Sequence, residues 1–257
     1  MLSRYPLHDI LTEGRLGIGL FINFAAPALV EMAAIAGFDF IVIDNEHGPI
    51  GPSEAEGMIR AAEAARIAPL VRLDSPDLAL RFLDLGATGI IFSNVGSRAD
   101  AQRAVDAVRF PPLGRRGVAP STHAAGYGVR MKISDHLAAA NELLLTMILI
   151  ESPEGVGAID EILGVSGITS VGIGQMDLSA SMGFHHNFAS PEVEAAGNHV
   201  IACCKAHGVP VMLPGGDAET AARSIERGGS LLLVIAGSWM IGAARSYLSA
   251  VRAAATA

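Results

Sequence analysis

The sequence predicts a (β/α)8 barrel, and three observations support this fold class. The chain has 257 residues, which is the usual length of one such barrel. Short apolar runs rich in β-branched residues alternate with alanine-rich stretches from end to end, as expected for buried parallel strands separated by helices. Apolar residues make up 51% of the chain and charged residues only 17%, a composition typical of a compact α/β enzyme.

Eight strands and eight helices are expected in strict alternation. The expected strands are Gly17–Ile22, Phe38–Asp44, Ala68–Arg72, Gly89–Ser93, Leu143–Glu151, Ile168–Gly174, Val209–Leu213 and Ser230–Ile235. The expected helices are Ala26–Ala36, Ser53–Ala65, Pro76–Leu85, Arg98–Val108, Gly155–Leu163, Pro191–Ala206, Ala218–Arg227 and Ser238–Ala253. This alternation favours a closed barrel over an open doubly wound sheet. Because no linker or break in composition divides the chain, we expect a single domain over residues 1–257.

Two connections are longer than the others, Phe110–Ala140 and Leu178–Ser190. Long loops in a compact domain are often active-site lids or contacts between subunits. We therefore expect these two segments to lie near the functional site or at an interface.

Charge and composition exclude several classes of partner. The net charge is −8 and no basic run is present, so nucleic acid is not an expected partner. The only cysteines, Cys203 and Cys204, are neighbours and cannot form an ordinary disulfide. The start of the chain lacks the apolar core of a signal peptide, and Leu231–Ala244 is too short to cross a bilayer. These features predict a soluble, cytoplasmic protein that has no membrane partner.

Charged residues gather where the expected strands end. The second strand runs into Asp44-Asn45-Glu46-His47, the third ends on Arg72, the fifth on Glu151, and the sixth leads to Asp177. In a (β/α)8 barrel, the catalytic residues stand at the C-terminal ends of the strands. We therefore expect these side chains to share one site.

Glu151 and Asp177 lie one βα unit apart and can project into the same mouth. Two carboxylates with room for water and substrate favour Mg²⁺ or Mn²⁺, with Co²⁺ as a further possibility. Zinc is less expected, since no His/Cys cluster has ligand spacing and H-E-x-x-H is absent.

Imine and nicotinamide chemistry are disfavoured. The two lysines, Lys132 and Lys205, lie in the long loop and in a helix, away from any strand end. A Schiff-base aldolase or a pyridoxal enzyme needs a lysine in the site. The glycine patterns at Gly17-x-Gly19 and Gly172-x-Gly174 lack the third glycine and the acidic residue of a dinucleotide fingerprint. Metal-assisted enolisation is therefore favoured over an imine, and NAD is not expected.

Several motifs identify a family resemblance over almost the whole chain. The stretches AGFDFIVIDNEHGP, LVRLDSPD, LDLGATGIIF, FPPLGRRGV, IESPEGVGAIDEILGVSGI and GIGQMDLSASMGF resemble the HpcH/HpaI family of class II, pyruvate-dependent aldolases. The resemblance implies a barrel of the phosphoenolpyruvate/pyruvate type. It also implies a homohexamer built from dimers that swap the final helix. The specific features are D-x-E-H, ESPEGV and DLS-x-SMG, in that order.

The resemblance implies a role for each matching residue. Glu151 and Asp177 match the metal ligands, and Arg72 matches the arginine that contacts the keto oxygen. His47 matches the acid/base histidine, which Asp84 in FLDLG would orient, and Asp44 lies beside that pair. The remaining matches concern the donor: backbone N–H groups of Gly174-Gln175-Met176 would bind its carboxylate, and Leu213 would pack against its methyl carbon.

The sequence departs from the family's usual pattern at three places. Leu149 replaces a glutamine that many members carry two residues before the metal-binding glutamate. Gly174-Gln175-Met176-Asp177 replaces Gly-Pro-Ala-Asp, and Phe92-Ser93-Asn94 stands where Val-Pro is common. The metal ligands are kept, but the preference for donor and acceptor is left open.

The predicted function is a metal-dependent aldolase. It would reversibly cleave a 4-hydroxy-2-oxo acid into an aldehyde and pyruvate, or a related 2-oxo acid such as hydroxypyruvate, through a metal-stabilised enolate. The nearest rival is a CoA-thioester lyase of the malyl-CoA or citryl type, although no basic nucleotide groove is evident. A phosphoenolpyruvate-mutase-like enzyme is a second rival. A non-catalytic barrel that binds 2-oxo acids is a third, but the intact set of charged residues argues against it.

Overall fold

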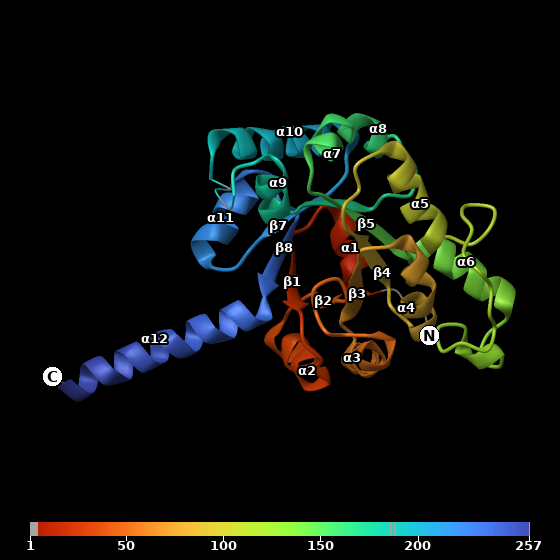
Figure 1. Ribbon diagram of the computed structural model, residues 1–257. Coiled ribbons are helices and arrows are strands. Elements are labelled where there is room, and N and C mark those ends of the chain that lie inside the picture. Colours follow the sequence, from red (N-terminus) through yellow and green to blue (C-terminus); the bar gives the residue numbers. More distant parts are fainter. Residues whose placement is uncertain (1–4, 186, 188, 257) are drawn as a thin grey trace.

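The computed structural model describes residues 5–185, 187 and 189–256. Eight parallel strands close into a barrel in the order β1 to β8 (Figure 1), which confirms the predicted fold class. The strands are β1 Gly17–Ile22, β2 Phe40–Asp44, β3 Ala68–Leu73, β4 Gly89–Phe92, β5 Leu145–Ile150, β6 Ser170–Ile173, β7 Val211–Pro214 and β8 Leu231–Ile235. Closure is made by β1, which pairs with β8 through Gly17–Leu231 to Phe21–Ile235 and with β2 on its other side.

Twelve α-helices are present in the described residues, and most of them cover the outside of the barrel. They are α1 Pro6–Glu13, α2 Pro27–Ala36, α3 Pro52–Ala65, α4 Ala79–Leu85, α5 Arg98–Val108, α6 Ile133–Leu143, α7 Pro153–Gly157, α8 Ile159–Leu163, α9 Gln175–Ser181, α10 Pro191–His207, α11 Ala218–Glu226 and α12 Ala236–Thr256, with 3-10 turns at Pro76–Leu78 and Gly126–Gly128. Several of them begin at a residue whose side chain accepts a backbone N–H of the first turn, as Ser97, Ser190 and Asp217 do. Because a cap joins residues that are close in the sequence, it can be recognised there as the start of a helix.

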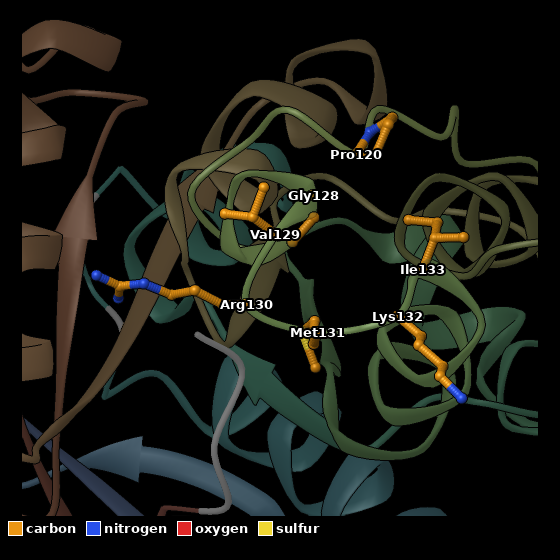
Figure 2. A pocket seen from close by; sticks show the side chains of 8 residues that line it. Pro120, Gly128, Val129, Arg130, Met131, Lys132 and Ile133 are labelled. Carbon is orange, nitrogen blue, oxygen red and sulfur yellow. The ribbon is translucent and has the colours of Figure 1, made fainter.

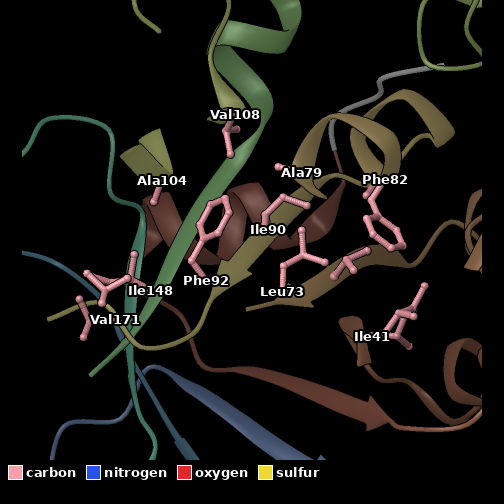
Figure 3. Close-up of a cluster of buried hydrophobic side chains, with 14 of the residues drawn as sticks. Ile41, Leu73, Ala79, Phe82, Ile90, Phe92, Ala104, Val108, Ile148 and Val171 are labelled. Carbon is pink, nitrogen blue, oxygen red and sulfur yellow. The ribbon is translucent and has the colours of Figure 1, made fainter. Parts of the chain in front are cut away.

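The strands divide their side chains between two apolar clusters. In β5, Met147 and Leu149 face the barrel interior, whereas Ile148 and Ile150 belong to the cluster between the barrel and its helices. Figure 3 shows part of this outer cluster, in which Phe92 and Ile148 lie close to side chains from the surrounding helices. Burial on both faces explains why the strands read as continuous apolar runs.

Helix α1, which the sequence analysis did not predict, precedes the first strand. Leu7 and Ile10 pack with Phe40 and Leu145 of the barrel interior. Phe40 lies over Gly19, where an added Cβ would stand 2.2 Å from the ring. The helix therefore closes the end of the barrel at which the strands begin, and leaves the other end open.

Helices α6 and α9 also differ from the prediction, because they overlap the two long connections, in which helices were not expected. The expected helix at Gly155–Leu163 is divided into α7 and α8, and several strands begin about two residues later than expected. The final helix extends away from the barrel (Figure 1). Within the described residues, none of the helices is both long enough and apolar enough to span a membrane.

Candidate active site

A cavity of about 460 Å³ opens at the C-terminal ends of the strands. It is lined by Phe21, His47, Arg72, Ile91, Leu149, Glu151, Gly172, Ile173, Gly174, Gln175, Met176, Asp177, Met212, Leu213, Pro214, Leu233 and Ile235. Eight of these residues were expected to form the site. Segments that are far apart in the sequence therefore bring His47, Arg72, Glu151 and Asp177 to one opening, as the fold class requires.

Asp44 anchors the arginine of the site. Its side chain is buried at the end of β2, and its Oδ1 accepts a hydrogen bond from Arg72 Nε at 2.9 Å. The backbone N–H groups of Glu46 and His47 donate to the same oxygen at 3.2 and 3.3 Å. One carboxylate thus shapes the turn that follows β2 and ties it to β3.

Glu46 is a second partner of Arg72 that the sequence analysis did not assign. Its Oε2 lies 3.2 Å from Arg72 Nε and accepts a hydrogen bond from Ser93 Oγ at 2.5 Å. On its other side, the guanidinium lies 4.8 Å from the centroid of the Phe21 ring. The D-x-E-H motif contained this residue, but sequence alone could not tell whether the glutamate faces the site or solvent.

Glu151 lines the cavity and is buried, with 4% of its surface exposed. Its Oε2 accepts the backbone N–H of Asn94 at 3.1 Å. This bond ties the segment after β4 to the end of β5. Asn94 adopts a φ of +55°, a conformation that asparagine tolerates better than most residues.

Burial raises the pKa of Glu151 to about 7, and the negative charges of Glu46 and Asp177 add to this effect, whereas the Asn94 N–H opposes it. An isolated carboxylate in an apolar site favours the protonated form. Glu151 is therefore poised to exchange a proton for a cation at neutral pH.

Gly174 makes room for the Glu151 side chain. A Cβ at this position would stand 2.2 Å from Glu151 Oε1 and 2.5 Å from its Cγ. The glycine is required because the carboxyl group occupies the space that any side chain would need. Asp177 follows in the first turn of α9 and lines the cavity near Glu151.

The donor set fits a divalent cation held by only two protein ligands. Arg72 is already paired with Asp44 and Glu46, and the carboxylates of Glu151 and Asp177 line the same cavity without a salt-bridge partner among the described residues. Within the described residues, three or more His, Cys, Asp or Glu side chains do not converge on one point. Substrate and water would therefore complete the shell, as is usual for Mg²⁺.

Asp84 does not reach His47 within this chain, so the orienting contact that the family resemblance implied is not made here. Asp84 lies near the end of α4, which leads back to the start of β4, at the opposite end of the barrel from the mouth. Its Oδ1 accepts a hydrogen bond from Arg116 Nη2 at 2.8 Å, and that arginine side chain is fully buried. A helix runs antiparallel to the strand that it precedes, and this sets Asp84 apart from the mouth.

Leu213 lines the cavity as expected, but it belongs to the outer cluster between strands and helices. Its neighbour Met212 points into the barrel interior instead. Because side chains alternate along a strand, Met212 is the more central lining residue of β7. Met212 was not among the residues expected to form the site.

A second hollow, of about 510 Å³, lies in the connection before β5 and is lined by Pro120, Ala125 and residues 128–133. Figure 2 shows Arg130 and Lys132 extending away from each other around it. It has no converging polar groups and lies apart from the charged mouth. Lys132 and Lys205 do not line the catalytic cavity.

The barrel and its mouth define a class of protein. An acidic side chain just after β5 and another in α9, at the same mouth as an arginine from β3, suit a carbon–carbon lyase that polarises a 2-oxo acid. The sequence agrees: residues 17–228 match the pattern of the family described as HpcH/HpaI aldolase/citrate lyase. The chain belongs to this family.

Relatives over the greater part of the chain support this assignment. The chain is 33% identical over 226 residues to the 5-keto-4-deoxy-D-glucarate aldolase of Citrobacter koseri, with 87% of each chain covered. It is 34% identical over 233 residues to the hydroxypyruvate/pyruvate aldolase of Sagittula stellata, covering 90% of this chain and 91% of the relative. The crystal structure of a family member from Burkholderia cenocepacia J2315 superposes with a TM-score of 0.91 at 33% identity, covering 96% of this chain and 99% of that one. The predicted family and activity class are confirmed.

Proposed function

We propose that this protein is a divalent-metal-dependent aldolase that cleaves a 4-hydroxy-2-oxo acid into pyruvate, or a related 2-oxo acid, and an aldehyde. The observation that carries the proposal is the shared cavity of Glu151, Asp177 and Arg72. The reaction needs one group to withdraw electrons from the keto acid and another to move a proton, and both kinds of group stand at this mouth.

Glu151 and Asp177 would hold the cation, and the excess of carboxylates over Arg72 is the electrostatic reason for it to bind there. Hard carboxylate oxygens favour Mg²⁺ or Mn²⁺, and Co²⁺ would also fit. When bound, such an ion acts as a Lewis acid that stabilises negative charge on the keto acid.

Arg72 would stabilise the oxyanion that develops on the keto oxygen. Within the described residues, its ion pairs are made through Nε, and the terminal nitrogens would donate to the substrate. The guanidinium fork is preorganised by Asp44, Glu46 and the Phe21 ring, and holding a donor in place before the reaction lowers the reorganisation cost.

His47 would transfer the proton to or from the aldol hydroxyl. Its ring stands exposed at the mouth, and its backbone N–H is held by Asp44. An imidazole changes protonation state near neutral pH more readily than other side chains. The Gly174 N–H already donates to the Ile150 carbonyl oxygen at 3.1 Å, so the N–H groups of Gln175 and Met176, in the first turn of α9, would bind the carboxylate of the donor.

A homo-oligomer is part of the proposal. Helix α12 exposes Trp239, Met240, Ile241, Leu248 and Val251, each at 45% or more of its surface. A helix that leaves its own barrel with apolar side chains uncovered suits docking on another subunit. The helix would be exchanged between subunits, and by family resemblance the assembly would be a hexamer, which sedimentation velocity would test.

The test is release of pyruvate from a series of 4-hydroxy-2-oxo acids, followed by coupled reduction of the pyruvate, with Mn²⁺ present or removed by chelator. Wild-type activity should depend on the cation and be lost in Glu151→Gln. The matched control is Glu154→Gln, since Glu154 is exposed in the first turn of α7, just after Glu151. Activity that is indifferent to chelator would contradict the metal assignment.

A CoA-thioester lyase is the less supported candidate, because the relatives from Citrobacter koseri and Sagittula stellata are both named as aldolases. It would use the same carboxylates and arginine. A comparison of malyl-CoA cleavage with hydroxy-oxo-acid cleavage separates the two reactions.

A further inference from the structure

The floor of the cavity is entirely apolar. Below the rim of charged residues it is lined by the side chains of Phe21, Ile91, Leu149, Met212 and Leu233, which come from five different strands. Leu149 and Met212 both lean over Gly172, since a Cβ there would stand 2.5 Å from Leu149 Cδ2 and 2.9 Å from Met212 Cε. These two side chains therefore form a continuous surface on the side of the barrel that carries Glu151.

The polar groups of the cavity are confined to its rim. They are His47, Arg72, Glu151, Gln175 and Asp177. Among the described residues, the buried side-chain atoms that lack a hydrogen-bond partner belong to Arg116, His136, Thr146 and Ser179, none of which lines the cavity. The floor therefore offers a bound hydroxyl group no side-chain hydrogen-bond partner.

A small 2-oxo acid has two polar ends to place, its carboxylate and its keto oxygen, and the rim supplies partners for both. The remaining carbon, C3, carries the substituent that distinguishes one donor from another. With the polar groups of the donor held at the rim, the substituent on C3 would lie against the floor, where Leu149 and Met212 stand.

We propose that Leu149 and Met212 make the site selective for donors whose C3 carries hydrogen or an alkyl group, and that they disfavour a C3 hydroxyl. This inference rests on the proposed function and names the donor class: pyruvate and 2-oxobutanoate are preferred over hydroxypyruvate. A hydroxyl that is buried without a partner loses its hydrogen bonds to water, whereas a methyl group of similar size loses nothing.

2-Oxobutanoate and hydroxypyruvate form a matched pair, since a methyl group in one replaces a hydroxyl group of similar size in the other. The rejection of an added hydroxyl by an apolar pocket is about 10²-fold at most, and a single unpaired group gives about tenfold or more. We therefore expect kcat/KM for hydroxypyruvate to be about 10- to 100-fold below that for 2-oxobutanoate with the same acceptor aldehyde.

The first measurement is exchange of the C3 hydrogens of each donor with D₂O, followed by NMR in the presence of Mg²⁺ and without any aldehyde. It reports enolate formation on the donor alone. Calorimetric titration of the three donors into the Mg²⁺-loaded protein gives their dissociation constants as an independent readout. Pyruvate and 2-oxobutanoate should exchange fastest and bind most tightly.

Substitutions at Leu149 and Met212 then test whether the apolar floor causes the donor preference. Met212→Gln, which keeps the side-chain length, and Leu149→Asn should each narrow the ratio between 2-oxobutanoate and hydroxypyruvate by at least about fivefold. Leu149→Met is the matched control, because it changes shape but not polarity, and it should keep the wild-type ratio.

The outcomes separate the two proposals. If pyruvate exchanges but hydroxypyruvate matches 2-oxobutanoate in the wild-type protein, the donor preference is wrong and the aldolase function stands. If none of the donors exchanges, the proposed function fails and the preference fails with it. Should the polar variants unfold, the wild-type comparison of the matched donors still decides the preference.

Discussion

Replacing Gly174 by alanine perturbs the candidate metal site through packing alone, without removing a charge. The added Cβ would lie 2.2 Å from Oε1, 2.5 Å from Cγ and 2.7 Å from Cδ of Glu151. Non-bonded carbon and oxygen atoms do not approach so closely, so the carboxyl group must move by about 1 Å or more. The other residues that line the cavity are unchanged in this variant.

The size of the effect follows from two principles. Forcing a methyl group into a packed site costs about 1–3 kcal/mol of stability. A displacement of about 1 Å in a group that positions the reacting centre costs about 10²-fold in rate. We therefore expect Gly174→Ala to fold, to unfold at a lower urea concentration, to bind Mn²⁺ more weakly, and to lose about 10²-fold in kcat/KM.

Urea denaturation, Mn²⁺ titration and the pyruvate-release assay measure these three effects. The matched control is Gly157→Ala at the end of α7, where an added Cβ meets no heavy atom within 4 Å. The control should keep wild-type affinity and activity. If Gly174→Ala also keeps them, Glu151 does not stand where the structure places it relative to the ion, and the reasoning about the metal site is refuted.

Three further predictions concern charges. Arg72→Ala should lower kcat/KM by about 10²–10³-fold in the pyruvate-release assay through loss of the oxyanion donor, and unchanged turnover would exclude that role. The pKa of Glu151 lies at about 7 rather than its ordinary 4.5. Between these two pH values the cation-free folded protein therefore binds more protons than the unfolded chain does. Its stability falls as the pH rises through this range. A cation that replaces the proton removes this loss. The rise in Tm on adding Mg²⁺ should therefore grow from pH 5 to pH 8, and a pH-independent rise would count against the site. Asp84→Asn leaves the buried Arg116 without its carboxylate, which should cost about 3 kcal/mol in urea unfolding. The double variant Asp84→Asn/Arg116→Met should recover part of that stability, whereas lost activity at full stability would indicate a direct part of Asp84 in catalysis.

Much of the fold could be predicted because its signals are local. Each strand is a short apolar run and each main helix an alanine-rich stretch, so the order and type of elements follow from neighbouring residues. The elements that were not predicted lie where contacts between residues distant in the sequence decide the structure. Helix α1 is stabilised by Phe40 and Leu145 of the barrel interior, and helix α6 lies in a segment whose sequence also suits a loop.

The candidate site, like the fold, has parts that could be predicted from the sequence and parts that could not. The positions of Glu151, Asp177 and Arg72 follow from one rule, that parallel strands present their C-terminal ends at one mouth, and that rule needs only the order of strands. The contacts that were not predicted join groups at the ends of neighbouring strands, β2 with β3 and β4 with β5. Glu46 pairs with Arg72, and the Asn94 N–H pairs with Glu151, through contacts that span 26 and 57 residues of sequence.

The amino-acid sequence by itself determined the barrel, the family and the charged rim, because these depend on hydrophobic periodicity and on short motifs. Only the tertiary structure decided that Asp84 pairs with Arg116 at the far end of the barrel, that Gly174 makes room for Glu151, and that Leu149 and Met212 form an apolar floor. The physical reason is that burial and pKa depend on which atoms from distant strands come within a few ångströms of each other, and that distance is set by closure of the barrel.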